Sequence, residues 1–82
     1  MSAEKDSLPK MNEECANVLK SVVAALDSPL PYQQTQARAL LEILYEKKCK
    51  EALEWIHEKY SNHPAVHVQK IAERAHEFYN RL

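Results

Sequence analysis

Apolar residues recur three and four positions apart along four stretches of this chain, with polar residues between them. That spacing is the period of a helix that buries one face. It predicts four helices, at residues 9–26, 32–46, 50–60 and 64–82. The predicted fold is therefore all-α, a small bundle of about four short antiparallel helices arranged as helical hairpins.

Prolines mark two of the three breaks between these helices. Pro29 and Pro31 end the first helix, and Pro64 lies in the first turn of the last, because the residue before a proline disfavours helical geometry. No proline separates the second and third stretches, so one long helix over residues 32–60 is the alternative. That helix would be about 43 Å long, and the apolar face turns by about 120° between the two stretches. A turn near residues 47–49 is therefore predicted.

The N-terminal boundary is predicted from a cap. Ser7 can accept a hydrogen bond from the first helical turn, and Pro9 suits that turn because its missing N–H would have no partner there. Residues 1–8 then form a disordered N-terminal tail, and residues 9–82 form a single helical domain.

The apolar faces also predict the core and a candidate interaction surface. Ile43, Trp55 and Val66 are apolar but miss the main face of their helices, which makes them the candidate surface for a partner. For Trp55, partial burial in the core is the alternative. The residues expected to dominate the core are Leu19, Val22, Leu41, Leu44, Ile56, Ile71, Ala75 and Phe78.

The composition of the chain excludes several classes of function. The chain has no glycine, and glycine-rich phosphate loops of the Walker and Rossmann types need residues that tolerate positive φ. Its formal net charge is −1, so no overall field attracts nucleic acid or an anionic membrane. We expect no cofactor, no catalytic residue and no small-molecule substrate.

The two cysteines, Cys15 and Cys49, are predicted to be reduced, because stapled secreted domains of this size usually carry more than two. No apolar stretch resembles a signal peptide or approaches the roughly 20 residues that span a bilayer. The cytoplasm is the predicted location, without a membrane partner.

Two Glu-x-x-His motifs suggest a metal site. Glu54 and His57 lie on the third predicted helix, and Glu73 and His76 lie on the fourth. Di-iron bundles use such pairs, pointing inward. Here Glu54 and Glu73 each lie about 150° from the apolar face of their helix, so we expect both in water and assign no metal ligand.

One basic run, Lys47, Lys48 and Lys50, raises nucleic-acid binding as another alternative. Binding surfaces for nucleic acid usually carry more charge. The run instead suits the C-terminal end of the second helix, where cations are favoured. Nucleic acid is therefore not expected as a partner.

Two local resemblances accompany these patterns. Glu51-Ala52-Leu53, Ile56 and then Pro64, twelve residues after Ala52, resemble the second helix and closing proline of a tetratricopeptide repeat. Tyr32-Gln33-Gln34 followed by Leu40-Leu41-Glu42 is similar to the second helix of the small chaperones of type III secretion needle subunits. Both resemblances imply a helical protein that binds another protein.

The function predicted from these observations is a protein–protein interaction module, adaptor or chaperone-like regulator without catalytic activity. Its partner is another protein or a second copy of the chain in a homodimer. The alternative is a small metal-binding helical bundle that uses the Glu-x-x-His pairs.

Overall fold

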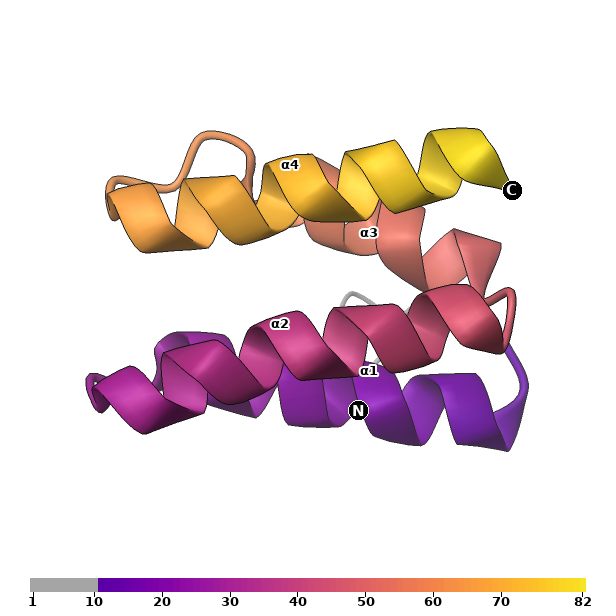
Figure 1. The fold of residues 1–82 in the computed structure, drawn as a ribbon, viewed down its shortest axis with the longest axis horizontal. Helices are drawn as coiled ribbons and strands as arrows, with labels where there is room; N and C mark the ends of the chain where they lie inside the picture. Colours follow the sequence, from indigo (N-terminus) through magenta and orange to yellow (C-terminus); the bar gives the residue numbers. More distant parts are fainter. Residues whose placement is uncertain (1–10) are drawn as a thin grey trace, which may run out of the picture.

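The computed structural model describes residues 11–82, which form four helices and no strand (Figure 1). They are α1 (Glu13–Asp27), α2 (Pro31–Glu46), α3 (Lys50–Tyr60) and α4 (Val66–Arg81). The predicted all-α bundle is confirmed. Within this part of the chain, none of the helices has the length and apolar character needed to cross a membrane.

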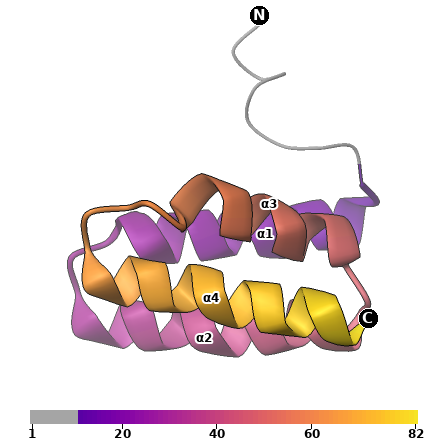
Figure 2. The same cartoon turned by 90° about the horizontal axis from the view of Figure 1, so that it is seen from above.

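The helices form two antiparallel hairpins, α1 with α2 and α3 with α4, and contacts are densest within each hairpin. The hairpins stack so that α1 and α3 make one layer and α2 and α4 the other (Figures 1 and 2). Alternate helices therefore run parallel. The N-terminal ends of α2 and α4 lie at the same end of the bundle, and their C-terminal ends lie at the other.

Helix α1 begins later than predicted. Asn12 is its N-cap, with an extended backbone and a side-chain oxygen that accepts a hydrogen bond from the Cys15 N–H at 2.8 Å. The helical spacing of apolar residues continues back to Met11, but that residue precedes the cap. The start predicted at Pro9 is thus wrong, and the predicted tail, residues 1–8, lies outside the described residues.

The predicted turn between α2 and α3 is confirmed, and the long continuous helix is excluded. A 43 Å helix would exceed the longest dimension of the molecule, 33 Å. Lys48 has a φ of 58°, and the next N–H, that of Cys49, donates to the Leu44 carbonyl at 2.8 Å. The Lys48 N–H donates to the Tyr45 carbonyl at 3.0 Å. This pair of bonds is the Schellman motif, built here on lysine where glycine is the usual residue.

Pro64 lies in the turn before α4, two residues before the helix begins at Val66, and not in its first turn as predicted. His63 organises this turn. Its Nδ1 accepts a hydrogen bond from the Ala65 N–H at 3.0 Å, and its carbonyl accepts one from the Gln69 side chain. The His63 N–H donates to the Tyr60 carbonyl at 3.1 Å, so hydrogen bonds of this residue hold the connection at both of its ends.

One apolar core joins the four helices. The eight residues predicted to dominate it are all buried. Further buried side chains come from every helix, including Leu26, Ala37, Leu53, Tyr60 and Val68. Ala39 and Ile43 are apolar residues of α2 that lie outside this core, and both are exposed. Helix α2 contacts all three other helices, and its buried residues are Ala37, Leu41 and Leu44.

Candidate functional site

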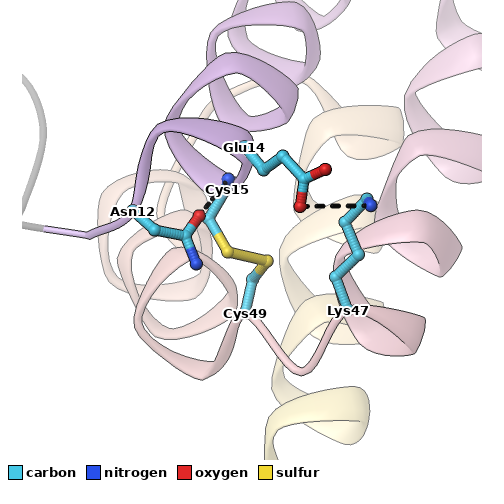
Figure 3. The surroundings of a disulfide bond; sticks show 5 residues. All are labelled: Asn12, Glu14, Cys15, Lys47 and Cys49. Atoms are coloured by element: carbon cyan, nitrogen blue, oxygen red, sulfur yellow. Dashed lines mark hydrogen bonds and ion pairs between the residues drawn. A yellow bond between two sulfur atoms is a disulfide. The ribbon is translucent and has the colours of Figure 1, made fainter.

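A disulfide joins Cys15 to Cys49 (Figure 3), so the prediction of reduced thiols is wrong. Cys15 lies in the first turn of α1, and Cys49 is the N-cap residue of α3. Because α1 and α2 are antiparallel, the start of α1 lies beside the turn that follows α2. The Cα atoms are 5.8 Å apart, within the span of a disulfide, and both side chains are buried.

The disulfide links the two hairpins, and it does so beside the turn that connects them along the chain. An ion pair at the same end joins Lys47 Nζ to Glu14 Oε1 at 3.4 Å. Both groups are exposed, so this pair contributes at most about 1 kcal/mol. Covalent connection between the hairpins is therefore concentrated at one end of the bundle.

The opposite half of the α2/α4 layer carries a groove of about 590 Å³. One wall is the first two turns of α2, and the other is the N-terminal three-quarters of α4. Towards the disulfide end, the Tyr45 and Phe78 rings stack between these helices with centroids 4.6 Å apart. The groove therefore begins where the aromatic contact between α2 and α4 stops.

Charged and polar side chains line this groove. Its lining residues are Pro31, Gln34, Thr35, Arg38, His67, Lys70, Ile71, Glu73, Arg74 and Glu77. Ile71 is buried and belongs to the core, so it lies at the base of the α4 wall. We call this feature the α2/α4 groove. Its volume is in the range of ligand-binding clefts.

The residues of the predicted interaction surface do not form one patch. Ile43, 37% exposed, lies near the C-terminal end of α2, whereas Val66, 63% exposed, is the first residue of α4 at the opposite end of the bundle. Trp55 lies on α3, in the other layer, half-buried against the core and edge-on to Tyr60 at 6.2 Å between ring centroids. A role for these three residues in binding stays a prediction.

The two Glu-x-x-His motifs meet through their histidines alone. The His57 and His76 rings stack with centroids 4.2 Å apart. Glu54 and Glu73 are both exposed, as predicted, and Glu73 lines the α2/α4 groove instead. Within residues 11–82, no three histidine, cysteine, aspartate or glutamate side chains gather closely enough to hold a metal ion.

The basic run is divided among separate contacts. Lys47 pairs with Glu14, and the Lys50 Nζ lies 5.0 Å from the centroid of the Tyr79 ring. Lys48 holds the left-handed position of the turn. The three lysines therefore have different neighbours, although Lys48 and Lys50 line one pocket beside the disulfide.

One titratable side chain at the groove end of the bundle is perturbed. Burial raises the pKa of the Tyr60 phenol, and the negative charge of Asp27 raises it further. Tyr60 ends α3 and Asp27 ends α1, so the two parallel helices of the second layer also finish together.

Sequence reasoning missed the groove residues Arg38 and Arg74 and the pairing of Cys15 with Cys49. Each residue of these pairs lies on a different helix or turn, and no local spacing connects them. Comparison with models of protein families, with curated proteins and with solved structures finds no match for this chain.

Proposed function

We propose that this protein is a helical protein–protein interaction module without catalytic activity, and that its partner binds in the α2/α4 groove. The observation that carries the proposal is the groove itself, which two helices of different hairpins line with mostly exposed side chains. A rigid helical scaffold that presents such a groove suits the docking of a segment from another protein.

The disulfide supports this proposal because it reduces the freedom of the unfolded chain and so stabilises a small scaffold. It also bears on location. Disulfides persist mainly in oxidising compartments, and this favours such a compartment over the predicted cytoplasm. A thiol-alkylation assay on protein isolated under acid quench from its native cell tests the location: two protected cysteines support the oxidising compartment, and two alkylated ones support the cytoplasm.

Site-specific photo-crosslinking tests the proposed function. A photoreactive amino acid replaces Thr35, an exposed residue at the rim of the groove, and in a matched control it replaces Lys20, an exposed residue on α1 in the other layer. We expect one defined adduct from the Thr35 position that excess unlabelled protein abolishes, and none from Lys20. An adduct with a second copy identifies the homodimer, and the absence of any adduct from Thr35 contradicts the proposal.

The stacked pair of His57 and His76 gives the metal-binding alternative one specific observation in its favour. Zinc sites use three or four ligands, so the pair would need further ligands from outside residues 11–82 or from a second copy. Elemental analysis of the purified protein decides between the two readings. Stoichiometric metal that is lost in His57→Ala and in His76→Ala would replace the interaction module with a metal-binding bundle.

A further inference from the structure

The lysine and arginine side chains of the α2/α4 groove form no ion pair within residues 11–82, and they outnumber the two glutamates that line the same groove. Arg38, Lys70 and Arg74 line the groove, and the only ion pair formed among residues 11–82 joins Lys47 to Glu14, at the other end of the bundle. The Arg74 guanidinium lies 5.5 Å from the centroid of the Phe78 ring. A contact with an aromatic ring uses no hydrogen-bond acceptor, so the N–H groups of the guanidinium stay available to a ligand.

Arg38 and Arg74 line the groove from its two different walls, Arg38 on α2 and Arg74 on α4. On a helix each residue advances about 100°, which puts each arginine about 100° from the centre of its helix's buried face. Both therefore lie on the flank that forms a wall. Arg38 is seven residues from the start of α2 and Arg74 is eight residues from the start of α4, or about 10 and 12 Å along the axes. The helices run parallel from the same end (Figure 1), so the arginines lie at similar heights.

The ends of the two helices strengthen the positive character of this region. Neither α2 nor α4 has an acidic residue in its first turn or a side-chain cap at its N-terminus. The partial positive charge at those ends is therefore not offset locally. Helix α1 differs, because Asn12 caps it and Glu13 and Glu14 occupy its first turn.

Acidic side chains define the outer edge of the same wall. Glu73 and Glu77 line the groove but lie about 150–160° from the centre of the buried face of α4, farther out than Arg74. An anion fits between the arginines, whereas a cation fits beside the two glutamates. This pattern suits a peptide with acidic residues at its centre and a basic residue at its flank better than it suits a phosphate backbone, which the glutamates would repel.

The dimensions of the groove suit a short segment of polypeptide. The α4 wall extends from His67 to Glu77, about 15 Å along the helix axis. That length matches four to five residues of extended chain at about 3.3 Å each. The buried Ile71 at the base offers an apolar contact for one side chain of such a segment.

We propose that the α2/α4 groove binds an acidic segment of a partner protein, with carboxylates of that segment paired to Arg38 and Arg74. This inference rests on the proposed function and specifies the chemistry of the partner. Paired N–H groups of arginine match the two oxygens of a carboxylate, so both walls contribute directed contacts.

Fluorescence anisotropy tests the inference with three labelled peptides of equal length: one rich in glutamate and leucine, one with glutamine in place of glutamate, and one with lysine in its place. We expect the acidic peptide alone to bind, with an affinity that falls as salt is added. The variant Arg38→Gln/Arg74→Gln should weaken binding about tenfold, the effect of losing two ion pairs of ordinary strength. The control Lys20→Gln/Lys59→Gln removes the same charge from exposed positions outside the groove and should bind as the wild type does.

Equal binding of the acidic peptide to both double variants overturns the inference, as does tighter binding of the glutamine or lysine peptide. So does a single-stranded oligonucleotide that binds and depends on Arg38 and Arg74 while the acidic peptide does not. The crosslinking experiment separates the two proposals. An adduct from Thr35 that the acidic peptide fails to displace refutes the acidic segment and retains the interaction module, whereas no adduct from Thr35 refutes both.

Discussion

Removal of the disulfide should cost this protein a large part of its stability. The bond joins residues 34 positions apart in the sequence. In the chain-entropy model, opening a loop of that length lowers the free energy of unfolding by about 4 kcal/mol. Domains of this size have a total stability of about 4–12 kcal/mol. Reduction should therefore lower the melting temperature by about 15–30 °C, at about 4–8 °C per kcal/mol.

Urea unfolding, followed by far-ultraviolet circular dichroism, measures this loss in the oxidised protein, the reduced protein and the variant Cys15→Ala/Cys49→Ala. The reduced protein and the variant should both fall below the oxidised protein by similar amounts, because both lose the same constraint on the unfolded chain. Their dependence on urea should also be steeper than that of the oxidised protein, since an unlinked unfolded chain exposes more surface.

Two results would refute this reasoning. A difference below about 1 kcal/mol between oxidised and reduced protein would show that the loop constraint contributes little, contrary to the chain-entropy estimate. Sensitivity of Cys15→Ala/Cys49→Ala to a reducing agent would show that the reductant acts elsewhere. The mass of the protein after alkylation in denaturant, without reductant, is the control, because an intact disulfide leaves no thiol to alkylate.

Three further changes have defined outcomes. Lys48→Gly should stabilise the protein by about 1 kcal/mol in urea unfolding, because glycine adopts the left-handed backbone of the α2–α3 turn without the penalty that lysine bears; Lys48→Ala, which keeps the penalty, should give no gain. Asn12→Ala should destabilise by about 1 kcal/mol through loss of the α1 cap, and Asn12→Asp should restore most of it; an equal loss in both variants would contradict capping. Tyr60 has a raised pKa in the folded state, so its contribution to stability is complete below the unfolded pKa of about 10 and declines as the pH rises beyond it. Melting curves of Tyr60→Phe should therefore lack the part of the alkaline loss of stability that comes from Tyr60. Identical pH profiles for the variant and the wild type would exclude this contribution of Tyr60.

Local rules predicted most helix boundaries in this chain. The end of α1 and the start of α2 follow from Pro29 and Pro31, and the end of α2 and the start of α3 follow from the rotation of the apolar face near residues 47–49. The start of α1 was wrong because Ser7 and Pro9 satisfy the same rules for a cap and a first turn that Asn12 satisfies in the structure. Sequence spacing alone does not choose between two adjacent caps.

The disulfide and the α2/α4 groove depend on tertiary arrangement and so escaped sequence reasoning. Cys15 and Cys49 each fit an apolar helix position, which favoured reading them as separate core residues. Arg38 and Arg74 each lie on the flank of an amphipathic helix, where charged residues are common. The two arginines come to line one groove only because the two hairpins stack with α2 and α4 parallel.

The placement of the disulfide makes one end of the bundle the natural pivot for a rotation of one hairpin relative to the other. Both covalent connections between the hairpins lie at one end, and α2 extends 16 residues, about 24 Å, from that end. A rotation of one hairpin by about 5° about the disulfide end displaces the start of α2 by about 2 Å from simple arc geometry over that length. The Tyr45–Phe78 contact lies near the pivot and moves far less. Such a rotation would change the width of the groove, and it would also displace the buried side chains of Ala37 and Val68, which pack in the shared core towards that end.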